Sequence, residues 1–274
     1  MGYDNRFYGL NDFSPRNDYT PSMELYAWII FFLAVFIGSY IQSLIGFGMG
    51  LIIVGVSSIS GGIDFSVLTA AVSLITLFNI VVSIKGHIAE IHKKMLFFMV
   101  LGQLPCIAIG LLLANHLSAR AVASLELLLA IFLLISGSIM VYKPQPIATL
   151  SSVPHLIMGG AGGGITGGLF AASGPVVGWF GYRQPLELNV IRATLLSFFS
   201  IACISRTVLV GVTGGLTEQV WSLAAVSIPL TLIGAWMGTI LKPKISDSEL
   251  KRLVFALLIL MGIYIAVRAI AKLV

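Results

Sequence analysis

Residues 25–63 read LYAWIIFFLAVFIGSYIQSLIGFGMGLIIVGVSSISGGI, a stretch of 39 residues without one formally charged side chain. As one continuous helix this stretch would be about 58 Å long, nearly twice the roughly 30 Å hydrocarbon core of a bilayer. Glycine destabilises a helix interior, and Gly46-Phe47-Gly48-Met49-Gly50 places three glycines near the middle. We therefore expect a helix, an unwound break at residues 46–50 and a second, shorter helix that folds back.

A second uncharged stretch of the same length covers residues 144–182. It contains Ser173-Gly174-Pro175, and proline removes an amide donor and clashes with the preceding turn of a helix. We expect the same order of helix, break and shorter helix here, with the break at these three residues.

The composition of the whole chain is typical of a membrane protein. Its 274 residues are 58% hydrophobic and only 10% charged, whereas a soluble domain carries about 25% charged residues. This excludes a disordered chain, a disulfide scaffold and an ordinary cytosolic enzyme, and it favours helices over barrel strands, which would alternate polar and apolar residues. The net charge of +5 is spread over short clusters between apolar runs, so the lipid bilayer, and no nucleic acid, is the expected surrounding.

Six further apolar segments have lengths that suit a membrane span. They cover residues 65–84, 95–114, 121–142, 188–210, 220–241 and 250–270. With the two broken stretches they make about eight hydrophobic segments in two groups of four. Landmarks recur in the same order in both groups, for example Pro105 and Gly110 as Pro229 and Gly234, which indicates an internal duplication.

We accordingly predict three parts. Residues 1–24 form a polar extramembrane tail, residues 25–142 a first membrane repeat and residues 143–274 a second membrane repeat. The first segment of each repeat is the one that is broken into a hairpin-like element.

Loop charges indicate how the two repeats are related. The loop at residues 85–94 carries three lysines, whereas its counterpart at residues 211–219 has no lysine or arginine. After the next segment the bias reverses, because residues 242–252 carry four basic residues and the counterpart only Arg120. Since basic loops stay in the cytoplasm, we expect inverted repeats, with an odd number of crossings in each half and both termini outside.

The two breaks are the candidate substrate site. Unwound backbone is tolerated at membrane depth only where it is buried in protein or lines a cavity, and freed N–H groups at helix N-termini favour anions. Paired breaks in two halves point to the substrate site of a transporter, although glycines can also serve only to let helices pack closely. The candidate binding residues are those of the breaks and two polar residues within spans: Gly46, Phe47, Gly48, Met49, Gly50, Ser173, Gly174, Pro175, Asn79 and Arg192.

Charged residues inside the spans are few. Arg192 and Arg206 share one segment and lie about 21 Å apart near one face of a helix. A charged residue in a span usually faces the interior or a cavity, but both arginines are near enough to an end to reach the interface instead; we favour Arg192 over Arg206 as the anion contact. Glu126 is the deepest carboxylate, so neither a midplane proton relay nor a cationic substrate is favoured.

No cofactor or metal is expected. The four histidines lie in or beside loops without the acidic or thiol companions of a metal site, and the chain has no Walker A sequence. The glycines at residues 162–164 and 167–168 fit close helix packing better than a dinucleotide fingerprint. With neither a nucleophile–base pair nor a metal cluster at membrane depth, an enzyme is disfavoured.

The glycine motifs resemble those of the TauE/SafE family of membrane permeases, also described as sulfite exporter-like. The residues that carry the likeness are Gly46-Phe47-Gly48-Met49-Gly50-Leu51, and Gly167-Gly168-Leu169 running into Ser173-Gly174-Pro175. Ser173 stands where the family usually has glycine. The resemblance implies carriage of small anions such as sulfite, sulfonates or organic acids across the bacterial cytoplasmic membrane.

We therefore predict an all-α polytopic membrane protein that acts as a secondary transporter of a small anion by alternating access. It is expected as a multi-pass protein of the bacterial inner membrane, with a homodimer left open as its assembly. A passive anion channel is the alternative, and a membrane-embedded enzyme is a weaker one.

Overall fold

The computed structural model describes residues 25–60, 63–120, 122–141, 146–241 and 247–273. The predicted tail at residues 1–24 lies outside these ranges. The helices of the first half are α1 (Leu25–Ile45), α2 (Met49–Ser60), α3 (Phe65–Ser83), the 3-10 turn η1 (Ile88–Glu90), α4 (Lys93–Arg120) and α5 (Val122–Val141). Those of the second half are α6 (Val153–Phe170), α7 (Gly174–Tyr182), α8 (Leu188–Val212), α9 (Glu218–Ile240) and α10 (Asp247–Leu273). Within the described ranges there is no strand.

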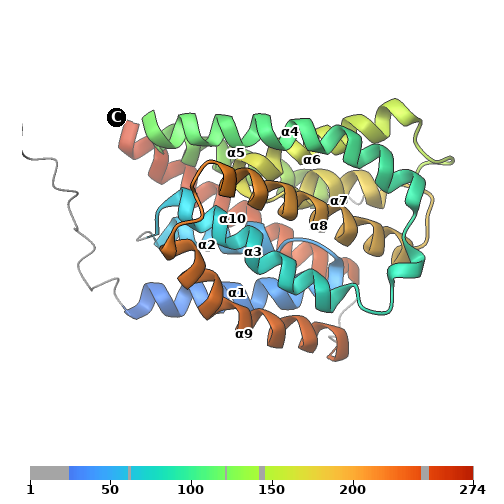
Figure 1. Cartoon of the computed structure of the whole chain (residues 1–274), viewed down its shortest axis with the longest axis horizontal. Coiled ribbons are helices and arrows are strands. Elements are labelled where there is room, and N and C mark those ends of the chain that lie inside the picture. The colour runs from blue at the N-terminus through green and yellow to red at the C-terminus, as the bar shows by residue number, and fades with distance from the viewer. Residues whose placement is uncertain (1–24, 61–62, 121, 142–145, 242–246, 274) are drawn as a thin grey trace, which may run out of the picture.

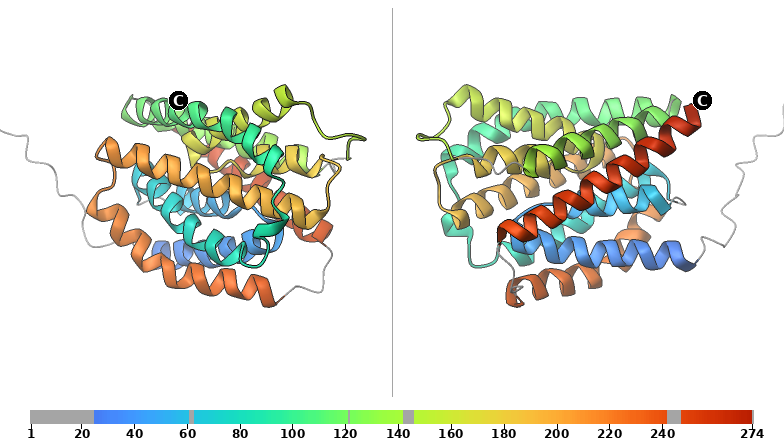
Figure 2. Two further views of the ribbon diagram at one scale, coloured as in Figure 1. Left: turned by 45° about the vertical axis from the view of Figure 1, so that its right-hand side comes forward. Right: turned by 180° about the vertical axis from the view of Figure 1, so that it is seen from behind.

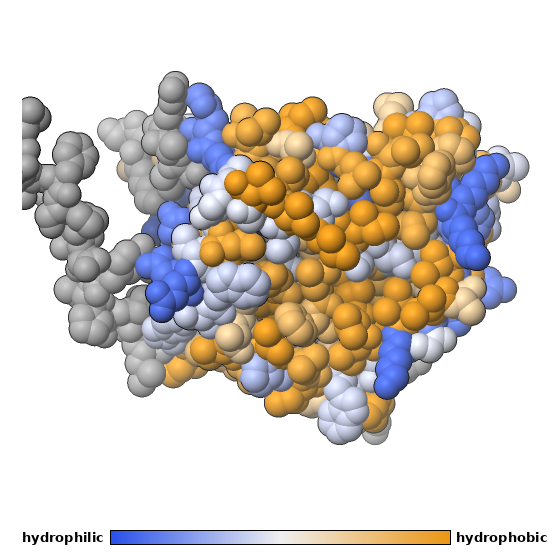
Figure 3. All heavy atoms as spheres, viewed as in Figure 1, coloured by the Kyte–Doolittle hydropathy of each residue, from blue (hydrophilic) through white to orange (hydrophobic). Residues whose placement is uncertain are grey.

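The helices lie side by side in one bundle, and α10 crosses its back obliquely (Figure 1, Figure 2). Five helices in the described ranges are long and apolar enough to cross a membrane. Three shorter apolar helices cover Met49–Ile59, Ala123–Ser138 and Phe255–Ala271. On the face seen in Figure 3, apolar side chains cover the middle of the surface and hydrophilic side chains gather toward its two ends. The predicted all-α polytopic membrane fold is confirmed.

The first break is confirmed, and it is short. α1 ends at Ile45 and α2 begins at Met49, so Met49 and Gly50 belong to the first turn of α2. Gly46 and Gly48 have φ angles of 83° and 111°, a region that side-chain-bearing residues rarely adopt. Two of the three glycines are therefore required by the backbone of the break itself.

The second break lies earlier than predicted. α6 ends at Phe170, Ala171 has a left-handed φ of 54°, and α7 begins at Gly174. The expectation that Gly174 and Pro175 are unwound is wrong, because both belong to the first turn of α7. Proline is favoured in a first turn for two reasons. The first N–H groups of a helix have no intrahelical partner, so the missing N–H of proline costs nothing, and the fixed φ of proline suits a helix.

The two halves contribute matching pairs of helices. α1 packs against α9 as α6 packs against α4, and α3 packs against α9 as α8 packs against α4. α5 packs against α10, and α3 against α8. Exchanging the two halves therefore leaves this set of pairs unchanged.

Helices at matching positions run in opposite directions along the bundle. α1 starts at the end where the chain's C-terminus lies, whereas α6 starts at the other end, which is also the end of the loop that follows α3 (Figure 1). The loop at residues 84–92, which carries Lys85 and leads into Lys93 and Lys94 at the start of α4, and its counterpart at residues 213–217 consequently lie at opposite ends of the molecule (Figure 1).

Close packing explains part of the glycine-rich sequence of α6. A Cβ added to Gly160, Gly164 or Gly168 would overlap backbone atoms of α4. These positions are four residues apart and share one face of α6. Small residues let two apolar helices approach to backbone contact, as we expected for the glycines of this segment.

Candidate functional site

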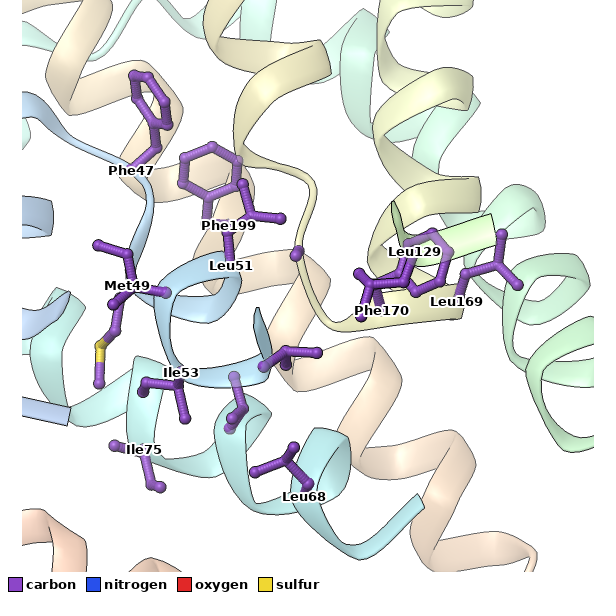
Figure 4. Close-up of a cluster of buried hydrophobic side chains, with 14 of the residues drawn as sticks. Phe47, Met49, Leu51, Ile53, Leu68, Ile75, Leu129, Leu169, Phe170 and Phe199 are labelled. Carbon is purple, nitrogen blue, oxygen red and sulfur yellow. The ribbon is translucent and has the colours of Figure 1, made fainter. Parts of the chain in front are cut away.

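The two breaks meet inside the bundle. A Cβ on Gly50 would lie 2.6 Å from the carbonyl oxygen of Ala171, and one on Gly174 would lie 3.0 Å from the ring of Phe47. Only glycine therefore allows these two segments to touch as they do. Phe47, Leu51 and Phe199 lie beside the unwound segment that follows Phe170 (Figure 4). The structure thus brings together two segments that are far apart in the sequence.

Aromatic contacts hold the first break in place. The ring of Phe47, which is 1% exposed, stacks on that of Phe255 in α10, with centroids 6.2 Å apart. Its centroid lies 6.0 Å from that of Tyr182 at the end of α7. The hydroxyl of Tyr182 donates a hydrogen bond of 2.6 Å to the carbonyl oxygen of Ile45. The second half of the chain therefore fixes the break that belongs to the first half.

A small cavity lies where the breaks meet. Its volume is about 30 Å³, enough for roughly two water molecules. The lining comes from both breaks and from one face each of α3 and α8: Gln42, Phe47, Gly48, Gly50, Leu51, Ser73, Thr76, Gly167, Ala171, Ala172, Ser173, Gly174, Phe199, Ala202, Cys203 and Arg206.

Five of the ten predicted site residues line this cavity, namely Phe47, Gly48, Gly50, Ser173 and Gly174. The other five, Gly46, Met49, Pro175, Asn79 and Arg192, are not part of the lining. The first three of these are neighbours of lining residues in the sequence. Asn79 and Arg192 take other positions, which are described below.

Arg206 is the cation of the cavity. Its side chain is 3% exposed, so it does not reach the interface. Nη1 donates to the carbonyl oxygen of Thr69 at 2.8 Å and to Oγ of Ser73 at 3.1 Å, and Nη2 donates to Oγ1 of Thr69 at 2.9 Å. Nε donates to the carbonyl oxygen of Gly168 at 3.3 Å. All of these acceptors are neutral.

No carboxylate in the described ranges forms an ion pair with Arg206. A buried charge is costly unless it is paired, and the hydrogen bonds to neutral acceptors orient the guanidinium without cancelling its charge. Arg206 is also the only formally charged residue among those that line the cavity. The site therefore has a positive charge that an anion in the cavity would compensate.

Amide groups at two helix N-termini also make the cavity favourable for an anion. Gly50 and Leu51 in the first turn of α2, and Gly174 in that of α7, line the cavity. The N–H groups of a helix's first turn have no intrahelical acceptor, and the helix dipole makes this end favourable for anions. The cavity thus combines one full positive charge with the positive ends of two short helices.

Gln42 and Asn79 form a buried clamp between α1 and α3. Nε2 of Gln42 donates to Oδ1 of Asn79 at 2.9 Å, and Nδ2 of Asn79 donates to the carbonyl oxygen of Ser39 at 3.0 Å. This arrangement turns Oε1 of Gln42 toward the start of α2, where it accepts from the amide of Met49 at 3.3 Å. Asn79 is therefore a positioning residue, and Gln42 is the member of the pair that borders the cavity.

Thr76 supplies a hydroxyl that has no hydrogen-bond partner among the described residues. Its side chain is 6% exposed, it lines the cavity, and no described residue hydrogen-bonds to its Oγ1. A buried hydroxyl without a partner costs free energy. An occupant of the cavity that accepts a hydrogen bond would remove this cost.

Arg192 lies beside the first break, outside the cavity lining. A Cβ on Gly46 would come within 3.0 Å of Cγ of Arg192, so the side chain packs along the break. The sequence alone ranks Arg192 above Arg206, because it cannot show which arginine meets acceptors from other helices. A usable signal was present: Thr69, Ser73 and Thr76 form a polar stripe on α3, and such a stripe needs a buried polar partner.

The described ranges contain no group of three or more His, Cys, Asp or Glu residues that could hold a metal ion. His92, at the start of α4, uses Nδ1 to accept from the amide of Met95 at 3.1 Å. Cys203 is a free, buried cysteine, and Cys106 is also free.

Fold and site together define a class of protein, the polytopic helical membrane proteins with a buried site at paired helix breaks. The model of the family described as "Sulfite exporter TauE/SafE" matches residues 30–265, and the chain belongs to this family of transporters. It is 32% identical over 234 residues to the "Probable sulfite/organosulfonate exporter TauE" of Cupriavidus necator, covering 85% of this chain and 91% of that protein. No solved structure matches the chain.

Proposed function

We propose that the protein is a secondary transporter of small sulfur-containing anions, such as sulfite or an organosulfonate, in the bacterial inner membrane. The observation that carries this proposal is the buried cavity with Arg206 as its cation and no carboxylate in ion-pair contact among the described residues. The Cupriavidus necator relative is named as a probable exporter of such anions. Sulfite and sulfonates both present several oxygen acceptors, which suit the guanidinium, amide and hydroxyl donors of the cavity.

Binding would occur between the two breaks. The anion would accept hydrogen bonds from the N-terminal amides of α2 and α7, and from the hydroxyl of Thr76, while Arg206 balances its charge. Because each break belongs to a different half of the chain, a relative movement of the halves would change both walls of the site at once. This coupling supports alternating access.

The relation between the halves supports the same mechanism. Residues 25–142 and residues 143–274 would be the two inverted repeats, since their helices pack in exchangeable pairs and run in opposite directions. In this account the lysine-rich loops lie in the cytoplasm and both termini lie outside. A homodimer stays a prediction.

Transport in proteoliposomes tests the proposal. The purified protein is reconstituted, and the uptake of labelled methanesulfonate and of labelled sulfite is measured against protein-free liposomes. We expect uptake that saturates with concentration and that accelerates when the vesicles are preloaded with unlabelled anion, because a carrier returns faster when it is loaded.

Other outcomes separate the alternatives. Uptake that rises linearly with concentration and does not respond to preloading would identify a passive channel. Recovery of a chemically altered anion from the vesicles would identify an enzyme. Uptake no faster than that of protein-free liposomes for every sulfonate and for sulfite would overturn the proposed substrate class.

A further inference from the structure

The charges that line the cavity limit the charge of the substrate, an inference that rests on the proposed function. Arg206 provides one positive charge, and its neighbours in the lining are small, apolar or neutral polar residues. Cys203 is the only other titratable residue in the lining. None of the lining residues is an acid that could balance Arg206, and none is a second cation that could balance a second negative charge.

We propose that the site accepts its substrate as a monoanion: a sulfonate with a single charge, or sulfite in its protonated form, bisulfite. A monoanion makes the occupied cavity neutral. A dianion such as sulfate leaves one negative charge in a buried site, where an unpaired charge is costly. The partial charge at a helix N-terminus is at most about half a unit and is spread over several N–H groups, and α2 and α7 have only 12 and 9 residues, so their ends stabilise an anion without placing a second full cation in the cavity.

Independent observations show that the cavity is built for an occupant. The hydroxyl of Thr76 is buried, borders the cavity and has no partner in the described protein. Arg206 is held in place by four hydrogen bonds from three of its nitrogen atoms. A guanidinium has five N–H groups, so one N–H of Nη2 is not used by these four bonds. One unpaired hydroxyl and one guanidinium N–H provide two donors for a single small anion.

Methanesulfonate and sulfate form the sharpest pair of probes. Both are tetrahedral and similar in size, and they differ by one negative charge because a methyl group replaces an oxygen. The two are compared on the wild-type protein, by thermal stabilisation in detergent and by inhibition of labelled methanesulfonate uptake into proteoliposomes. No variant is needed, so misfolding cannot confuse the result.

We expect methanesulfonate to bind at least about 100-fold more tightly than sulfate, the ratio that one uncompensated charge at membrane depth implies. Sulfate that competes as well as methanesulfonate while uptake of labelled methanesulfonate proceeds would overturn the monoanion proposal and leave the transporter assignment intact. Absence of methanesulfonate and of sulfite uptake would instead overturn the assignment itself.

Sulfite provides a second, independent measurement. It gains a proton near neutral pH, whereas methanesulfonate stays singly charged. The initial rate of sulfite uptake, divided by that of methanesulfonate at the same pH, is therefore expected to follow the bisulfite fraction and to fall as the pH rises. The ratio cancels any effect of pH on the protein that acts equally on the transport of both anions. A ratio that stays constant or rises with pH contradicts selection of the monoanion.

Discussion

Arg206 illustrates how a single residue can define a site. Its guanidinium meets acceptors on α3 and α6, so three helices including its own converge on one buried charge. Four hydrogen bonds to neutral oxygens fix its orientation but leave its charge uncompensated by any described carboxylate. In the proposed function this charge, rather than the number of hydrogen bonds, would make the cavity selective for anions.

A comparison of the two arginines of α8 tests this role. Arg206→Gln removes the charge from the cavity, and we expect the Kd for methanesulfonate to rise about tenfold or more, since hydrogen bonds to charged groups contribute about 1.5–3 kcal/mol. Arg192→Gln, which alters an arginine outside the lining, is expected to change it less than about threefold. Ligand-induced thermal stabilisation of the purified variants measures both.

A conservative variant of Arg206 separates the effect of the lost charge from an effect on folding. Arg206→Lys keeps the charge but loses the forked geometry of the guanidinium, so it should recover part of the affinity that Arg206→Gln loses. If Arg192→Gln weakens binding more than Arg206→Gln does in folded protein, the anion contact has been placed at the wrong arginine.

A substitution of Thr76 should weaken anion binding without lowering the stability of the protein. Thr76→Val removes a buried hydroxyl that no described residue hydrogen-bonds, so the stability should stay the same or rise slightly. The Kd for methanesulfonate should rise about threefold to tenfold, the worth of one hydrogen bond. Urea or thermal unfolding and ligand titration measure the two effects.

Ser73→Ala is the matched control for Thr76→Val. The hydroxyl of Ser73 accepts from Nη1 of Arg206 at 3.1 Å and donates to the carbonyl oxygen of Thr69 at 3.1 Å. Its removal should lower stability as well as affinity. An unchanged methanesulfonate Kd in Thr76→Val would show that this hydroxyl does not face the bound anion.

At the scale of the elements, the sequence predicts that the two long apolar runs are broken, but it does not predict which segments the breaks contact. Uncharged runs too long for one span, each with glycine or proline inside, sufficed to predict four helices in two broken pairs, and the structure confirms them. The second break was placed two residues too late, at 173–175 instead of 171–173, because proline breaks a helix interior but suits a first turn. Neither Ala171 nor Ala172 carries a local signal for unwinding.

The contact between the breaks could not be predicted from the sequence. Arg206 meets Thr69 across 137 positions, and Gly50 meets Ala171 across a similar separation. Such pairings depend on how the helices pack, which periodicity within one segment does not encode. The polar stripe of α3 indicated that a partner was needed, and the structure identifies it as Arg206.

The glycine at the contact of the two breaks gives an element-scale prediction. Gly50→Ala would place a methyl group 2.6 Å from the carbonyl oxygen of Ala171, and we expect it to separate the breaks and to lower stability by about 1–3 kcal/mol. Methanesulfonate uptake should fall with it. Thermal unfolding and flux measure the two.

Gly211→Ala is the matched control in the last turn of α8. Its methyl group would meet only the end of the Leu216 side chain, at 3.2 Å, and alanine favours helix. Stability and uptake should stay close to wild type. If Gly50→Ala behaves like Gly211→Ala, the tight junction of the breaks is not required for transport.

At the scale of the whole molecule, the central question is how the bundle sits in the membrane. On the face seen in Figure 3, apolar side chains separate two polar ends, and the loops that precede α4 and α9 lie at opposite ends (Figure 1). The lysine-rich end, which includes Lys85, is expected in the cytoplasm. The composition predicted a membrane protein, and the distribution of the few charges predicts its orientation.

Single cysteines report this orientation directly. Ala89→Cys and Gln219→Cys change exposed residues at the two ends. A membrane-impermeant maleimide applied to intact cells should label position 219 and not position 89, with labelling of both after the membrane is opened as the control. Labelling of both, or of neither, from the outside would contradict inverted repeats.

The most direct test of the account is an electron cryo-microscopy structure of the protein with methanesulfonate. We expect density for the anion between the first turns of α2 and α7, within hydrogen-bond distance of the guanidinium of Arg206 and of the hydroxyl of Thr76. An anion bound elsewhere, for example beside Arg192 with the cavity filled only by water, would contradict it.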